Sequence, residues 1–153
     1  MMKTFVIIVT YNGQKWIDKC VGKLRESTIP VTPIVIDNNS SDDTVAYIKK
    51  NYPETIVIAS DENLGFGRAN NLGTKKALEL GCDYVFLLNQ DAYLHDDALE
   101  KLIPVAQKNE KYAILSPIHI SEKKAIDPKF SAHLSEGGCP GFIYDLLHHQ
   151  LKA

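Results

Sequence analysis

Apolar residues recur along this chain with two spacings, and segments with one spacing alternate with segments with the other. Short apolar runs that end in polar or turn-forming residues predict strands at 5–10, 31–37, 55–60, 84–89 and 112–117. Apolar residues three or four positions apart predict helices at about 16–24, 45–48, 69–80 and 99–106. Gly81 should end the third helix, and Pro104 should kink the fourth or end its first part. This alternation predicts an α/β fold, with three α/β/α layers around a mainly parallel sheet.

Polar side chains follow the predicted strands, most clearly in "YVFLLNQDAYL" (84–94). A strand that is apolar on both faces needs cover on both sides, so its polar end should emerge at a sheet edge that faces a crevice, where open α/β sheets bind ligands. The same residue types form turns and helix caps, and "NNSSDDT" (38–44) taken alone is better explained in that way. The joint pattern favours a site made of Thr10, Tyr11, Asn12, Asp37, Asn38, Asp61, Asn63, Asn89, Gln90 and Asp91.

Composition excludes several classes of protein. The 17 Lys and Arg against 19 Asp and Glu give a net charge of −2, so the chain lacks the basic field that holds nucleic acid. Three cysteines without a CxxC spacing indicate reduced thiols, and no apolar run reaches the roughly 20 residues of a membrane-spanning helix. We expect a cytoplasmic protein and leave open contact with the inner face of the membrane. There is no Walker A, GxGxxG or GxSxG motif.

Four segments together resemble the family 2 glycosyltransferases of GT-A fold, in particular the rhamnosyltransferase-like members. They are "VIIVTYNG" (6–13), "IVIDNNSSDDT" (34–44), "ENLGFGRANNLG" (62–73) and "FLLNQDAYLHDDAL" (86–99), and the resemblance covers about residues 3–117. It implies a nucleotide-sugar-binding domain that serves polysaccharide biosynthesis. The implied reaction moves a sugar from a nucleoside diphosphate-sugar to a glycan or lipid-linked acceptor, with inversion and with help from a metal ion.

The resemblance also implies roles for the residues after the first two predicted strands. Thr10, Tyr11 and Asn12 would belong to the nucleotide pocket, and Asp37, helped by Asn38, would contact the base or ribose. A carboxylate can accept the N3 hydrogen of uracil or thymine, so we expect a uridine or thymidine donor.

The later segments supply the implied diphosphate and sugar contacts. Asn63 and Arg68 would face the diphosphate or the sugar. "NQD" stands at the D-x-D position of the family, so Asp91 would hold Mg²⁺ or Mn²⁺ while Asn89 and Gln90 shape ribose and sugar contacts. Asn89 replaces the usual first carboxylate with a neutral amide.

The general base that an inverting transfer needs lies well downstream of the D-x-D position in the family. Only 62 residues follow Asp91 here, and Glu136 and Asp145 stand in no context resembling the acidic motif of the family. We therefore expect the base to be absent from this chain and assign no catalytic residue. The expected domains are a nucleotide-sugar-binding GT-A domain at 1–117 and an incomplete acceptor-side segment at 118–153, a loop plus a C-terminal helix.

Two alternatives to a transferase remain open from the sequence. A non-catalytic nucleotide-sugar-binding or assembly module would keep the pocket without the acceptor half. A nucleotidyltransferase is a weaker alternative, because "YNGQKW" (11–16) is a poor match to the Gly-rich basic loop that such an enzyme needs. The segment "FIYDLLHHQL" (142–151) has helical apolar spacing and is expected to shield a surface or form a homodimer.

Overall fold

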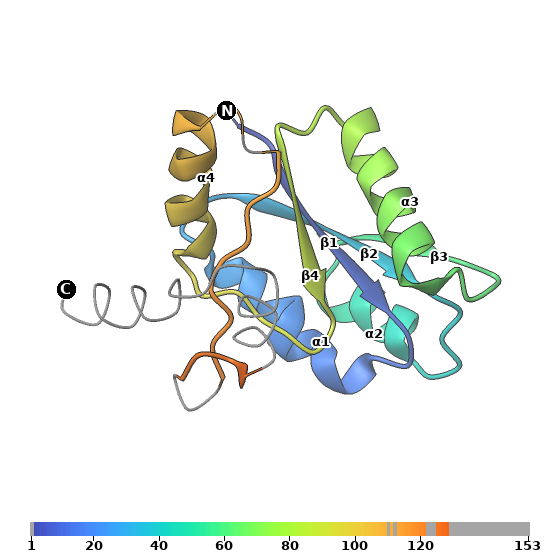
Figure 1. Ribbon diagram of the computed structural model, residues 1–153. Helices are drawn as coiled ribbons and strands as arrows, with labels where there is room; N and C mark the ends of the chain where they lie inside the picture. Colours follow the sequence, from blue (N-terminus) through green and yellow to red (C-terminus); the bar gives the residue numbers. More distant parts are fainter. Residues whose placement is uncertain (1, 110, 112, 122–124, 129–153) are drawn as a thin grey trace. The chain divides into compact units, whose positions relative to one another are not determined.

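A computed structural model describes residues 2–109, 111, 113–121 and 125–128. The chain divides into two units, 1–109 and 110–153, and the first holds a four-stranded sheet (Figure 1). All neighbouring strands run parallel in the order β3-β2-β1-β4, and their bounds are β1 Thr4–Thr10, β2 Val31–Asp37, β3 Ile56–Ala59 and β4 Tyr84–Asn89. The first four predicted strands and the α/β class are confirmed.

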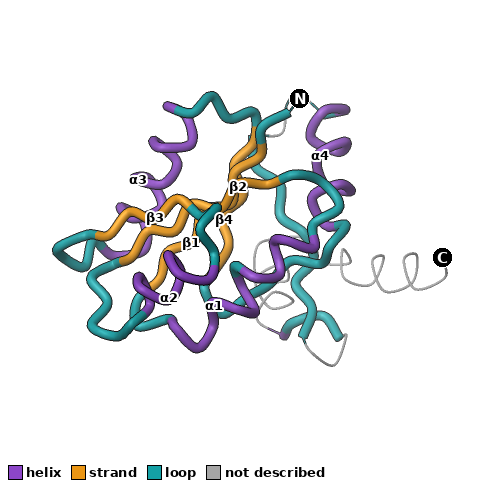
Figure 2. Tube along the Cα trace, turned by 180° about the vertical axis from the view of Figure 1, so that it is seen from behind, coloured by secondary structure: helices purple, strands orange, loops and turns teal. Residues whose placement is uncertain are grey.

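Helices cover both faces of this sheet (Figure 2). They are α1 Gln14–Cys20, the 3₁₀ helix η1 Gly22–Glu26, α2 Thr44–Asn51, α3 Gly65–Glu79 and α4 Ala98–Lys108. Alternate residues of β1 separate the two cores: Val6 and Ile8 pack with α1, η1, α2 and α4, whereas Phe5 and Ile7 pack with α3. All four side chains are buried, as expected for a parallel sheet with helices on both faces.

The order of the strands creates a switch point between β1 and β4. The chain moves outward from β1 to β2 and β3, with α1 and α2 on one face, and returns through α3 on the other face to place β4 on the opposite side of β1. The register of the strand pairs places the polar strand ends next to one another, since Thr10 pairs with Asp37 and Val9 pairs with Asn89. Loops that leave such a point diverge to opposite faces and leave a crevice.

Two expectations about the helices meet different outcomes. Gly81 follows α3 with φ of +75°, and the N–H of Cys82 donates to the carbonyl of Ala77, so the predicted glycine stop is confirmed. Pro104 does not end its helix, because α4 runs through it to Lys108, and of the two expected effects the kink stays a prediction. Pro104 lies on the exposed side, and burial of Ile103 on the sheet side stabilises the helix despite the missing hydrogen bond.

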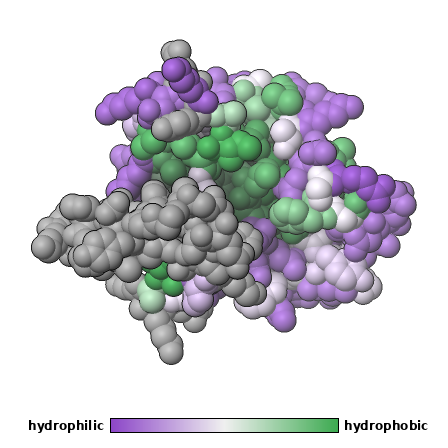
Figure 3. Space-filling view, viewed as in Figure 1, coloured by the Kyte–Doolittle hydropathy of each residue, from purple (hydrophilic) through white to green (hydrophobic). Residues whose placement is uncertain are grey.

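The predicted fifth strand does not form. Among the described residues, 113–117 belong to no strand, and Ile114 is 89% exposed. A strand is stable only when a neighbouring strand pairs with its backbone and its apolar side chains pack in a core. In the described part of the chain, β1 is the only strand paired with β4. Apolar side chains gather along β4 between α3 and α4 (Figure 3), and Leu87 is half exposed there. The predicted C-terminal helix lies outside the described residues.

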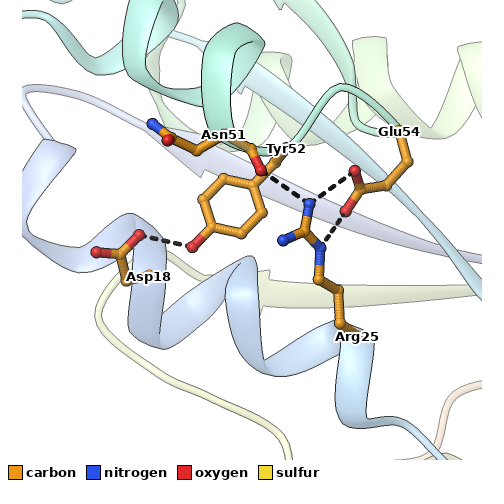
Figure 4. A network of polar contacts seen from close by, with 5 residues as sticks. All are labelled: Asp18, Arg25, Asn51, Tyr52 and Glu54. Atoms are coloured by element: carbon orange, nitrogen blue, oxygen red, sulfur yellow. Dashed lines mark hydrogen bonds and ion pairs between the residues drawn. The ribbon is translucent and has the colours of Figure 1, made fainter.

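A polar network joins α1 and η1 to the end of α2 (Figure 4). Arg25 stacks 4.5 Å from the ring centre of Tyr52, donates to the carbonyl of Asn51 and forms two hydrogen bonds to Glu54. The hydroxyl of Tyr52 donates to Asp18 at 2.6 Å, and burial together with this bond raises the pKa of Tyr52 to about 12. These contacts hold the helical layer on one face of the sheet. Within the described residues, no helix is long and apolar enough to cross a bilayer.

Candidate functional site

Gln90 joins the ends of β1 and β4 across the switch point. Its Oε1 accepts hydrogen bonds from Thr10 Oγ1 at 2.9 Å and from the backbone N–H of Tyr11 at 3.0 Å. Thr10 is fully buried, so Gln90 satisfies a hydroxyl that water cannot reach. Gly13 lies against this contact: a Cβ at position 13 would be 2.2 Å from Thr10 Oγ1 and 2.5 Å from Gln90 Oε1. The close packing therefore leaves no room for a side chain at position 13.

The turns after β1 and β2 hold each other through reciprocal hydrogen bonds. The N–H of Asn12 donates to Ser40 Oγ at 2.9 Å, and Asn12 Oδ1 accepts from the N–H of Ser41 at 2.8 Å. Asn12 has φ of +47°, a conformation that asparagine tolerates better than most residues. Asp37 fixes the second turn, because its two carboxylate oxygens accept from the N–H of Ser40 at 3.0 Å and from the Ser40 hydroxyl at 2.5 Å.

Asn38 connects the second turn to the start of α3. Its backbone N–H donates to the carbonyl of Thr10, and its side chain is almost fully buried. Its Nδ2 donates to Asn63 Oδ1 at 2.8 Å, and its Oδ1 accepts from the N–H of Leu64 at 2.7 Å. A single asparagine at a strand end thus sets the position of the glycine-rich segment.

A hollow of about 360 Å³ opens between these strand ends. The predicted site residues that line it are Tyr11, Asn38, Asn63, Asn89, Gln90 and Asp91. Val9, Gly65 and Phe66 line it as well and were missed by sequence reasoning. Phe66 is 59% exposed beside a glycine, and an aromatic residue inside a turn-forming segment was the signal that could have indicated it.

Five predicted site residues do not line this hollow, and one of them, Asp61, is exposed in the turn after β3. Thr10 and Asp37 are buried beneath it and hold the turns. Asn12 lines a separate hollow of about 450 Å³ near α1 and α2. Arg68 is exposed on α3, and its Nε donates to the carbonyl of Leu64 at 2.8 Å. The structure therefore separates residues that border the hollow from residues that shape its walls.

Asp91 is the only charged residue among the described residues that line the hollow. Burial, with a smaller contribution from the charge of Asp91, raises the pKa of the neighbouring Cys20 thiol to about 12. Cys20 is therefore a protonated core residue, and its Sγ lies 3.5 Å from the carbonyl oxygen of Asn89. Among the described residues no three His, Cys, Asp or Glu side chains gather in a metal-binding group. A cation here would depend on Asp91, the side-chain oxygen of Asn89 and oxygens of a ligand.

The sequence matches the family "Glycosyl transferase family 2" over residues 5–149. The chain belongs to this family. Among curated family 2 relatives, the dTDP-rhamnosyl transferase RfbF of Shigella flexneri is 28% identical over 125 residues, which is 79% of this chain and 40% of the relative. The N-acetylglucosaminyl-diphospho-decaprenol L-rhamnosyltransferase of Mycobacterium tuberculosis is 24% identical over 94% of this chain and 48% of its own length. The chain thus spans less than half the length of these two relatives.

Solved structures agree on the fold. TarS 1–349 of Staphylococcus aureus superposes with a TM-score of 0.63 at 24% identity, over 71% of this chain and 33% of that one. The mannosyltransferase PcManGT of Pyrobaculum calidifontis superposes with a TM-score of 0.58 at 22% identity, over 68% and 32%. The family 2 sheet of this chain is thus the GT-A arrangement that the sequence predicted.

Proposed function

We propose that this family 2 domain binds a nucleoside diphosphate-sugar in the hollow between β1 and β4 and contributes to transfer of its sugar to a glycan or lipid-linked acceptor. One observation carries the proposal: the hollow lies at the switch point of the sheet, and six residues singled out from the sequence line it. Tyr11 and Phe66 add half-exposed aromatic rings, which suit the flat faces of a base or sugar.

The donor is proposed to be of thymidine or uridine type. The relative RfbF is a dTDP-rhamnosyl transferase, which supports a thymidine diphosphate-sugar. Asp37 was predicted to contact the base, but Ser40 occupies its carboxylate oxygens. We assign Asp37 the task of holding the turn at 38–41, and its contact with the base stays a prediction, because each carboxylate oxygen keeps a second lone pair.

Asp91 and Asn89 would hold Mg²⁺ or Mn²⁺ together with the diphosphate. Both residues border the hollow, and within the described residues neither side chain has a hydrogen-bonding partner, so hard oxygen ligands are free for a cation. PcManGT, solved with GDP-Man and Mn²⁺, is a fold neighbour with such a complex. A bound divalent cation supplies neutralisation of the charge that grows on the departing nucleoside diphosphate.

Transfer with inversion needs an acceptor and a base besides the donor. The acceptor hydroxyl oxygen attacks the anomeric carbon from the side opposite the diphosphate, the bond from that carbon to the diphosphate oxygen breaks, and the hydroxyl proton passes to a base. Glu136 and Asp145, the acidic residues considered from the sequence, lie outside the described residues. The described residues are accordingly assigned donor binding and not proton transfer.

Calorimetry with the full chain tests donor binding. Thymidine and uridine diphosphates should bind, and should outcompete adenosine diphosphate. Incubation with sugar nucleotides and glycan acceptors, followed by mass spectrometry, measures transfer. No binding of any nucleoside diphosphate would refute the proposal, whereas binding without transfer would favour a nucleotide-sugar-binding module.

A further inference from the structure

Two amide side chains in the hollow are held by their oxygens. Gln90 Oε1 accepts from Thr10 Oγ1 and from the N–H of Tyr11. Asn63 Oδ1 accepts from Asn38 Nδ2 at 2.8 Å and from the N–H of Gly65 at 2.9 Å. The two residues come from different loops, one after β4 and the other before α3, and both line the hollow.

Backbone donors determine which way each amide faces. A backbone N–H can only donate, so the atom of Gln90 that meets Tyr11 must be the oxygen, and the same holds for Asn63 and Gly65. Each side chain therefore keeps its NH₂ group, with two donor hydrogens, away from that contact. Within the described part of the chain, neither NH₂ group has a hydrogen-bonding partner.

This arrangement restricts what the two residues can bind. A side-chain amide coordinates a metal through its oxygen, and these oxygens are already occupied. The NH₂ groups need acceptors, and no cationic side chain among the described residues lines the hollow to compete for them. Non-bridging phosphate oxygens accept hydrogen bonds and do not donate, whereas a sugar hydroxyl does both, so phosphate is the better match to a group that only donates.

We propose that Gln90 Nε2 and Asn63 Nδ2 bind non-bridging oxygens of the donor's diphosphate, and that neither residue is a metal ligand. This proposal rests on the proposed donor-binding function. It divides the hollow into two parts: Asn89 and Asp91 serve the cation, while the oxygen-held amides serve the phosphates. Asn38, Thr10 and the N–H groups of Tyr11 and Gly65 act as positioning groups that aim the amides.

The substitutions Gln90→Glu and Asn63→Asp test this assignment. Each keeps an oxygen for the existing hydrogen bonds and replaces the NH₂ donors with a negatively charged oxygen. Thymidine diphosphate affinity, measured with the full chain at neutral pH in excess chelator, should fall about tenfold or more in each variant. Chelator prevents a new carboxylate from recruiting metal. Asn71→Asp on α3 is the matched control, because it makes the same chemical change at an exposed position outside the hollow, and its affinity should stay within about twofold.

Three ligands distinguish whether the two amides contact the phosphates, the sugar or the base. Thymidine without phosphate, followed by NMR titration, should bind wild type and variants equally. A thymidine diphosphate-sugar should show the same loss as the diphosphate. If the variants lose affinity only for the sugar nucleotide, the amides contact the sugar and the proposal is overturned. If they lose affinity equally for thymidine, the amides contact the base or support the fold, and the proposal is overturned as well. Unchanged diphosphate affinity in both variants would overturn it while leaving donor binding intact. Failure of wild type to bind any nucleoside diphosphate would instead refute the proposed function.

Discussion

Replacement of Gly13 by alanine should damage the stability of the fold and the binding site together. The added methyl would lie 2.2 Å from Thr10 Oγ1 and 2.5 Å from Gln90 Oε1, and ordinary contacts begin near 3.4 Å, so at least one partner must move by roughly 1 Å. The Gln90 side chain can swing away from the methyl, but Thr10 is fully buried on β1, so relief of the closer contact also requires the Thr10 side chain or the backbone at residue 13 to shift. Movement of Gln90 breaks its hydrogen bonds to Thr10 and Tyr11.

The magnitude follows from these broken contacts. Each lost hydrogen bond lowers the free energy of unfolding by about 0.5–1.5 kcal/mol. The loss at Thr10 should cost more than the loss at Tyr11, because it leaves a buried hydroxyl without a partner. We expect the free energy of unfolding of Gly13→Ala to fall by about 2–4 kcal/mol. Urea unfolding followed by circular dichroism measures this change, and thymidine diphosphate affinity should fall in parallel because the amide of Gln90 is no longer aimed.

Gly67 provides the matched control. It lies in α3, and a Cβ added there meets nothing within 4 Å. Gly67→Ala should therefore leave stability unchanged or raise it by up to about 1 kcal/mol, through helix propensity. If the free energy of unfolding of Gly13→Ala lies within about 0.5 kcal/mol of the wild-type value, the contact of Gln90 with β1 does not hold this edge of the sheet, and the prediction is wrong.

Three further predictions concern other groups. Asp91→Ala should abolish the tightening of nucleoside diphosphate binding by Mn²⁺ without unfolding the domain; calorimetry with and without chelator checks this, and equal enhancement in wild type and variant contradicts the metal assignment. Cys20 should resist maleimide at pH 8 until urea is added, because its pKa is raised to about 12, and peptide mass spectrometry would expose the error if it reacts in the native state. Arg25→Met should lower the urea midpoint at pH 7, since the hydrogen bond from Arg25 lowers the pKa of Glu54 and this stabilisation is present above the ordinary pKa. The difference in urea midpoint between wild type and Arg25→Met should narrow as the pH falls through the lowered pKa of Glu54. A difference that does not change with pH would assign the effect to the stacking of Arg25 on Tyr52.

Much of the fold could be predicted from the sequence because the deciding signals are local. The four strands of the sheet are short apolar runs bounded by turn formers, and Gly81 can adopt a conformation that ends a helix. The run at 112–117 failed for the opposite reason: a strand at that position depends on a neighbour that local sequence does not specify. Pro104 does not end α4, since burial of Leu99 and Ile103 on one side of the helix outweighs the loss of one hydrogen bond, and local sequence does not show that burial.

The candidate site divides in the same way. The sequence by itself determined that polar residues stand at the carboxyl ends of four strands, because strand period and turn chemistry are properties of short segments. Only the tertiary structure decided the order β3-β2-β1-β4, which places the loop after β4 beside that after β1. It also brought Phe66 to the hollow and occupied the oxygens of Gln90 and Asn63. The hydrogen bonds of Asn63 with Asn38 and of Gln90 with Thr10 join residues 25 and 80 positions apart, and no local pattern determines such pairings.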